Sequence, residues 1–78
     1  MIDLARVVSM IEEATQAIPD SVDPECTLGD LGGWDSMGLV IFIELVQNET
    51  GVQLAVHELR ACATPGELVA LIQKSVKP

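Results

Sequence analysis

The apolar residues of this chain recur at helical spacing in three separate segments, and this pattern constrains the fold more than any other feature. A spacing of three or four residues places side chains on one face of an α-helix. In the first segment the stripe consists of Leu4, Val7, Val8, Ile11 and Ala14. Within 37–50 the expected core residues are Leu39, Phe42, Ile43 and Val46, and within 65–72 they are Leu68, Leu71 and Ile72. The chain is therefore predicted to be all-α.

Capping residues indicate where the first two main helices begin and end. Asp3 is a suitable N-cap for the first helix. Pro19 disfavours helical geometry at the residue before it, so this helix is expected to end by about Ile18. The second main helix is predicted to begin after Asp35 and to run through 37–50, because Asp35 is a good N-cap and a glycine follows at the C-terminal cap.

The last helix has the clearest start. Thr64 is its expected N-cap, Pro65 occupies the first helical position, and Glu67 completes a capping box. Residues 57–61 are expected to form one short helical turn. The segment 39–46 is rich in β-branched residues and could form a strand, but its caps and the length of its stripe favour a helix.

These elements add up to a single domain, residues 1–78, built as a small three-to-four-helix bundle. Residues 19–35 contain two prolines and three glycines, and they are expected to form a long ordered loop between the first two main helices. Val22, Leu28 and Leu31 are the side chains expected to pin this loop to the bundle. Loops this long within a compact domain are often functional.

Composition and charge argue against several classes of protein. Only Trp34 and Phe42 are aromatic, so the core must consist of aliphatic side chains, which suits helices. Twelve acidic residues against four basic ones give a net charge of −8, which disfavours nucleic acid and anionic membranes and favours basic protein surfaces. A role for this acidity in solubility alone is the alternative.

The sequence shows no membrane-spanning run, no signal peptide and no zinc-ligand spacing, and this bears on the expected location and metal binding. The longest apolar run, 39–43, is far shorter than a membrane span, and acidic residues interrupt the apolar stretch at the N-terminus, so no signal peptide is expected. Cys26, Cys62 and His57 have no zinc-site spacing. We therefore expect a cytoplasmic monomer that binds no metal of its own and makes no contact with membranes.

The stretch from Leu28 to Gly38 contains the residues most capable of chemistry. A loop with several glycines delivers Ser36 to the first turn of a helix, where its hydroxyl is an accessible primary alcohol. Free backbone N–H groups and the helix dipole at such a position favour a bound or covalently attached phosphate. On the residues alone, the simpler interpretation is favoured, in which Asp35 or Ser36 only caps the helix.

A catalytic role for Ser36 is not expected. A serine nucleophile needs a base within hydrogen-bond reach and a third group that orients the base. His57 is the only histidine, and the residues around Ser36 lack the G-x-S-x-G pattern of a nucleophile elbow. The chain is therefore predicted not to be an enzyme.

The motif and its setting resemble the acyl carrier proteins and their relatives, the peptidyl and D-alanyl carrier proteins. Asp35-Ser36-Met37 matches the Asp-Ser-Leu or Asp-Ser-Met that begins the second helix in that family. The resemblance extends over nearly the whole chain, from the stripe before the motif to the Thr64-Pro65 start of the last helix. The short motif is weak evidence by itself, and its placement in a chain of this length, order and acidity makes it specific.

The resemblance implies a division of labour between this chain and its partners. A separate phosphopantetheinyl transferase would move 4′-phosphopantetheine from coenzyme A onto Ser36. The thiol of that arm would then hold an acyl or aminoacyl group as a thioester for loading and downstream enzymes. Asp35 matches the residue that helps the transferase engage the site, with magnesium supplied in that complex.

Departures from the family pattern bear on the cargo. Fatty-acid carriers usually place acids along the helix after the serine, but positions 38, 41, 47 and 48 are Gly, Ile, Gln and Asn here. This favours a carrier for polyketide or other specialised biosynthesis. The Gly32-Gly33 pair is similar to peptidyl carriers and Met37-Gly38 to D-alanyl carriers, so aminoacyl cargo stays an alternative. An unmodified helical interaction module is a further alternative.

A second stripe on the helix after Ser36 is a candidate surface for partner enzymes. Met37, Val40, Ile41 and Glu44 lie on adjacent turns, beside the expected core stripe. An apolar stripe next to the attachment serine, edged by an acid, is a candidate docking patch. The alternative is that the long loop covers Val40 or Ile41.

Overall fold

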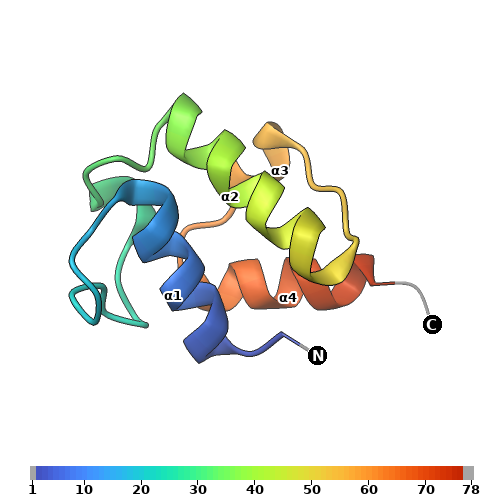
Figure 1. Ribbon diagram of the computed structural model, residues 1–78, viewed down its shortest axis with the longest axis horizontal. Helices are drawn as coiled ribbons and strands as arrows, with labels where there is room; N and C mark the ends of the chain where they lie inside the picture. Colours follow the sequence, from blue (N-terminus) through green and yellow to red (C-terminus); the bar gives the residue numbers. More distant parts are fainter. Residues whose placement is uncertain (1, 77–78) are drawn as a thin grey trace.

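The computed structural model describes residues 2–76. This part of the chain contains four α-helices (Figure 1). They are α1 (Leu4–Thr15), α2 (Ser36–Thr50), α3 (Val56–Arg60) and α4 (Pro65–Ser75), and a short 3-10 turn, η1 (Leu28–Asp30), lies in the loop before α2. The predicted all-α bundle with a long loop between its first two main helices is confirmed. Residues 39–46 lie in the middle of α2, so the strand alternative is wrong.

The helix ends follow the capping residues, with one correction. Asp3 Oδ1 accepts a hydrogen bond from Arg6 N at 2.8 Å, as expected of an N-cap. The helix α1 ends at Thr15, within the predicted limit of about Ile18, and Gln16 after it adopts a left-handed conformation with φ of 58°. The short helix α3 begins at Val56, one residue before the expected turn.

The predicted capping box of α4 is half correct. The Thr64 side chain accepts from Glu67 N at 3.3 Å, as predicted. The Glu67 carboxylate instead accepts from Ala63 N at 2.7 Å, one residue before the N-cap. The side chain of Glu67 therefore satisfies the N–H of the residue before the N-cap and not that of the N-cap itself.

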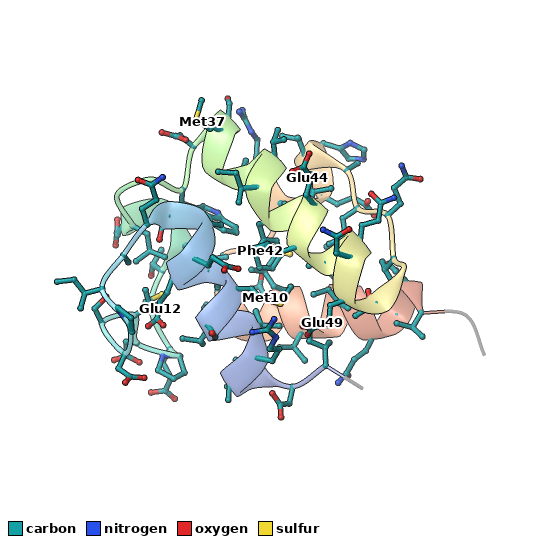
Figure 2. All side chains as sticks on the ribbon, viewed as in Figure 1. Met10, Glu12, Met37, Phe42, Glu44 and Glu49 are labelled. Carbon is teal, nitrogen blue, oxygen red and sulfur yellow. The ribbon has the colours of Figure 1, made fainter. Side chains whose placement is uncertain are left out.

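The core lies where α1, α2 and α4 meet, with α3 packed on α2 (Figure 1). Met10 of α1 and Phe42 of α2 lie between these two helices in the middle of the bundle (Figure 2), and both are fully buried. The other large side chains with almost no exposed surface are Ile11, Leu28, Leu39, Leu59, Leu68, Ile72, Val7, Val46 and Pro65. Within residues 2–76, no helix is long and apolar enough to cross a lipid bilayer.

The predicted core stripes differ from the structure at four residues. Met10 is fully buried although it lies outside the predicted stripe of α1, because α1 packs against both α2 and α4 and buries a wider face. Leu4, in the first turn of α1, is 39% exposed. Ile43 and Leu71 are only half-buried.

The long loop is held to the bundle by apolar side chains and by one buried carboxylate. Val22 and Leu28 are buried and Leu31 packs against the core, as predicted. Glu12 of α1, only 8% exposed, accepts a hydrogen bond from Val22 N at 3.0 Å through Oε2. A buried backbone N–H requires an acceptor, and this carboxylate supplies it.

An ion pair joins the start of α1 to the end of α2. Arg6 Nε lies 2.7 Å and 2.9 Å from the two carboxylate oxygens of Glu49, and Nη2 lies 2.6 Å from Oε1. The hydrogen bond from Arg6 lowers the pKa of the Glu49 carboxyl, and the same bond raises the pKa of Arg6. Both side chains keep contact with solvent, so the pair adds little to stability.

Candidate functional site

Asp35 forms the N-cap of α2 and leaves the Ser36 hydroxyl at the surface. Gly38 N donates to Asp35 Oδ1 at 3.2 Å, and Leu39 N donates to the Asp35 carbonyl at 2.8 Å. The predicted capping role of Asp35 is therefore confirmed, and the second main helix begins at Ser36. Both Asp35 and Ser36 are exposed.

Two glycines let the loop pass closely between the end of α1 and the start of α2. Gly33 has a φ of +88°, which strains any residue with a side chain. A Cβ on Gly33 would lie 2.9 Å from the Thr15 carbonyl oxygen, and a Cβ on Gly38 would overlap the Gly33 carbonyl oxygen. Gly38 is also buried, so the missing acid at this position reflects packing and carries no information about partners.

Trp34 packs the loop against the bundle beside this site. Its ring meets the Phe42 ring edge to face, with centroids 5.4 Å apart and an interplanar angle of 72°. Such pairs add stability beyond the area they bury. Next to it lies a groove of about 250 Å³ with a lining of Gly29, Trp34, Asp35, Leu39, Arg60 and Cys62.

Arg60 is a site residue that sequence reasoning missed. From the C-terminal end of α3, its Nη2 donates to Ser36 Oγ at 3.2 Å. A guanidinium stays protonated and cannot act as a general base, so Arg60 cannot activate Ser36 as a nucleophile. His57 is exposed on α3. No motif connects positions 36 and 60, so only the packing of α3 on α2 brings Arg60 to the serine.

The predicted partner surface is mostly open to solvent. Met37 is 74% exposed and points away from the bundle, and Val40 is 48% exposed (Figure 2). Glu44 is exposed on the same helix, whereas Ile41 is half-buried and packs against the core. The long loop therefore leaves Val40 open, and Ile41 is shared between the core and the surface.

The two cysteines are free and half-buried. Burial raises the pKa of the Cys26 thiol, and burial likewise raises the pKa of the Cys62 thiol, with nearby acids adding to both effects. A raised pKa keeps the reactive thiolate scarce at neutral pH. Although Cys62 lines the groove, its thiol is thus a poor nucleophile.

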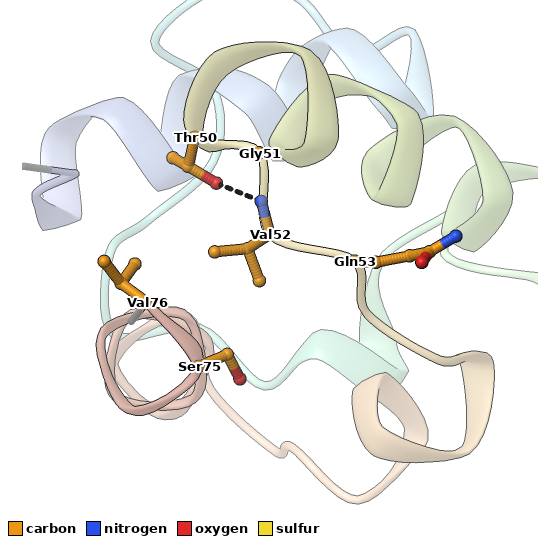
Figure 3. Close-up of a pocket in the computed structure, with 6 residues that line it drawn as sticks. All are labelled: Thr50, Gly51, Val52, Gln53, Ser75 and Val76. Atoms are coloured by element: carbon orange, nitrogen blue, oxygen red, sulfur yellow. Dashed lines mark hydrogen bonds between the residues drawn. The ribbon is translucent and has the colours of Figure 1, made fainter. Parts of the chain in front are cut away.

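A larger groove, of about 510 Å³, lies at the opposite end of α2 (Figure 3). Its lining is Thr50, Gly51, Val52, Gln53, Ser75 and Val76, and Thr50 Oγ1 accepts from Val52 N at 3.1 Å. No side chain in this lining carries a charge or titrates near neutral pH.

Two comparisons with known proteins found sequences similar to this chain. The family model described as "Phosphopantetheine attachment site" matches residues 5–72. The chain is 31% identical over 71 residues to the meromycolate extension acyl carrier protein of Mycobacterium tuberculosis. This alignment covers 91% of the chain and 62% of that relative. It is 32% identical over 71 residues to the protein of the same name from Mycolicibacterium aurum, with 91% of this chain and 73% of the relative covered. No solved structure matches with comparable significance.

Proposed function

Because the chain belongs to the phosphopantetheine-attachment family of carrier proteins, we propose that Ser36 is the residue that carries the arm. Members of this family are carriers and not enzymes, and their 4′-phosphopantetheine is covalently attached. The observation that supports Ser36 most directly is its exposed hydroxyl at the capped start of α2. When bound, the arm supplies a thiol that holds an acyl group as a thioester.

The residues around Ser36 fit a phosphodiester. The first N–H groups of a helix lack intrahelical acceptors and lie at the positive end of the dipole. Of these, Gly38 N is already used by the Asp35 carboxylate. The Arg60 guanidinium adds a full positive charge within 3.2 Å of Ser36 Oγ. An anion bonded to this oxygen therefore meets donors from α2 and α3.

The loading step requires a separate phosphopantetheinyl transferase, which we propose engages Ser36 and Asp35. Ser36 Oγ forms a bond to phosphorus while the pyrophosphate bond of coenzyme A breaks. The hydroxyl proton passes to a base on the transferase, and the nucleotide half of coenzyme A leaves. The Asp35 carboxylate is exposed beside Ser36, and we propose that it faces the transferase and the magnesium of that complex.

Intact mass measurement tests the attachment site. After incubation with coenzyme A and a broad-specificity transferase, the wild-type chain should gain the mass of one arm. Ser36→Ala should gain none, whereas Ser9→Ala, a change at an exposed serine of α1, should load like wild type. Modification of Ser36→Ala would show that the site is wrong, and an unmodified wild-type chain would favour the helical interaction module.

We propose acyl rather than aminoacyl cargo. Support comes from the mycobacterial relatives, whose name describes an acyl carrier for meromycolate extension. The chain spans 62% of the length of the M. tuberculosis relative. We therefore keep the pathway expected from the sequence, acyl-chain extension in polyketide or other specialised biosynthesis, as a proposal. Competing acyl and aminoacyl loading enzymes offered to the modified chain would decide between the two cargo classes.

We further propose that Met37, Val40, Ile41 and Glu44 contact loading and downstream enzymes. Exposed apolar residues beside an attachment point are typical of docking patches, and Met37 and Val40 are both exposed here. Acids such as Asp30, Asp35 and Glu44 would steer basic partners, so association rates should fall as salt rises. An association rate that stays constant from low to high salt would contradict this steering.

Paired substitutions test the patch. Val40→Glu should reduce loading by a cognate enzyme while leaving thermal stability close to wild type, because Val40 is nearly half exposed. Ile41→Glu should reduce loading and stability together, because Ile41 also packs against the core. Unchanged loading of a stable Val40→Glu variant would remove this residue from the patch.

A further inference from the structure

The positively charged side chain of Arg60 contacts the hydroxyl oxygen of Ser36, the proposed attachment site, although the chain as a whole is strongly acidic. The chain has twelve acidic and four basic residues. Among residues 2–76, the ion pair within 4.0 Å joins Arg6 to Glu49 and does not involve Arg60. The Arg60 side chain reaches instead from α3 to Ser36 Oγ, at 3.2 Å. Within the described residues, its charge is therefore available to an anion at Ser36.

We propose that Arg60 is the phosphate-binding residue of this carrier and that, in the modified protein, it holds the phosphodiester on Ser36 and ties α3 to α2. The inference rests on Ser36 being the attachment site. Attachment adds a negative charge directly at the oxygen that Arg60 already contacts. A guanidinium binds phosphate oxygens through charge-assisted hydrogen bonds, with a planar fork that a lysine lacks.

The position of α3 makes this contact consequential. The helix has only five residues, Val56–Arg60, and helices this short depend on tertiary contacts for their stability. Leu59 is buried against the core, whereas Arg60 and His57 are exposed. A phosphate held by Arg60 would give the last residue of α3 a second anchor, to the start of α2.

The same contact would set where the arm leaves the protein. Arg60 lines the groove of about 250 Å³ together with Trp34, Leu39 and Cys62. A phosphate bound by Arg60 therefore lies at the edge of that groove. Without Arg60, only the backbone N–H groups of α2 would hold the anion. These groups would not draw the phosphate toward the groove.

The experiment compares the unmodified and modified forms of wild type, Arg60→Gln and Arg60→Lys, with loading verified by intact mass. Amide hydrogen exchange in α3 should slow by about threefold on modification of wild type, as expected for a contact partly exposed to solvent. It should not slow in Arg60→Gln, and it should slow less in Arg60→Lys. The Arg60 Nε resonance should shift on modification, while that of Arg6, which is paired with Glu49, should not. Arg6→Gln is the matched control and should keep the full effect.

The outcomes separate the two proposals. If wild type is not loaded, or Ser36→Ala still is, the attachment site is wrong and the role of Arg60 fails with it. If wild type is loaded at Ser36 but its Arg60 resonance stays in place, and α3 exchange changes equally in Arg60→Gln, then Arg60 does not bind the phosphate. A threefold slowing that disappears in Arg60→Gln and weakens at high salt would support the contact.

Discussion

The helices α1 and α2 differ in how their apolar residues are used. In α1 the apolar side chains are mostly buried, since Val7, Val8, Met10 and Ile11 all face the core. In α2 apolar residues occur on several faces, and Met37 and Val40 stay 74% and 48% exposed. The composition of α1 is thus explained by folding, whereas part of the composition of α2 is not.

This difference supports the proposal that partner enzymes contact α2. A helix that only needs to be buried on one side gains nothing from exposed methionine and valine, and such residues in contiguous patches usually mark contact surfaces. On α2 they lie beside Ser36, at the end of the helix that also receives Trp34 and Arg60. The following substitutions test whether the apolar residues of α1 serve folding while the exposed ones of α2 do not.

The largest contrast is expected between a core residue of α1 and a surface residue of α2. Met10→Ala should lower the free energy of unfolding by about 2–5 kcal/mol, because it removes a fully buried side chain and leaves a cavity. Val40→Ala should change it by less than about 0.5 kcal/mol. Urea unfolding measures both, and a large loss in Val40→Ala would show that α2 uses this face for folding.

Gly38→Ala should have the next largest effect. The new Cβ would overlap the Gly33 carbonyl oxygen, so the loop or α2 must shift, at a cost of about 1–3 kcal/mol for an overpacked site. Gly29→Ala is the matched control, because a Cβ there meets no atom within 4 Å. Thermal unfolding of both variants measures the difference. Equal stability of the two variants would contradict the close approach.

Glu12→Ala should lower stability by about 1–2 kcal/mol, because it leaves the buried N–H of Val22 without its acceptor. Glu12→Gln keeps an acceptor oxygen and should lose less. Chemical denaturation of the two variants measures the loss. An equal loss in both would mean that the charge of Glu12, and not the hydrogen bond to the loop, is what matters.

The ion pair between α1 and α2 should give the smallest effect, and one that depends on pH. The pKa of Glu49 is lowered in the folded chain by the hydrogen bond from Arg6. Its contribution is therefore present above the ordinary glutamate pKa of about 4.3 and is lost as the pH falls through the lower folded value. The difference in unfolding midpoint between wild type and Glu49→Gln should be small at neutral pH and should vanish in acid. A difference that grows on acidification would have the wrong sign.

The sequence was sufficient to predict most of the fold, because helix signals are local. Asp3, Asp35 and Thr64 cap their helices as expected. The sequence was insufficient where contacts between distant segments decide the outcome. The burial of Met10, outside the predicted stripe, depends on a second neighbouring helix, and the burial of Glu12, for which no prediction was made, depends on the path of the loop.

The candidate site divides in the same way. Asp35, Ser36 and the exposed stripe beside them lie within nine residues of each other, so helical periodicity and a short motif were enough to propose them. The approach of Gly33 to Gly38 and the contact of Arg60 with Ser36 could not be predicted from spacing, because each depends on how a loop or a short helix is placed in space.

The close approach of Gly33 to Gly38 also limits how this carrier can be redesigned. Replacing α2 with the corresponding helix of another carrier would introduce a side chain at position 38 wherever the donor has one, and that side chain would collide with the Gly33 carbonyl. A chimera intended to change partner enzymes should therefore exchange residues 33–50 as one block. The segment before the serine and the helix after it form a single exchangeable part, because each is packed closely against the other.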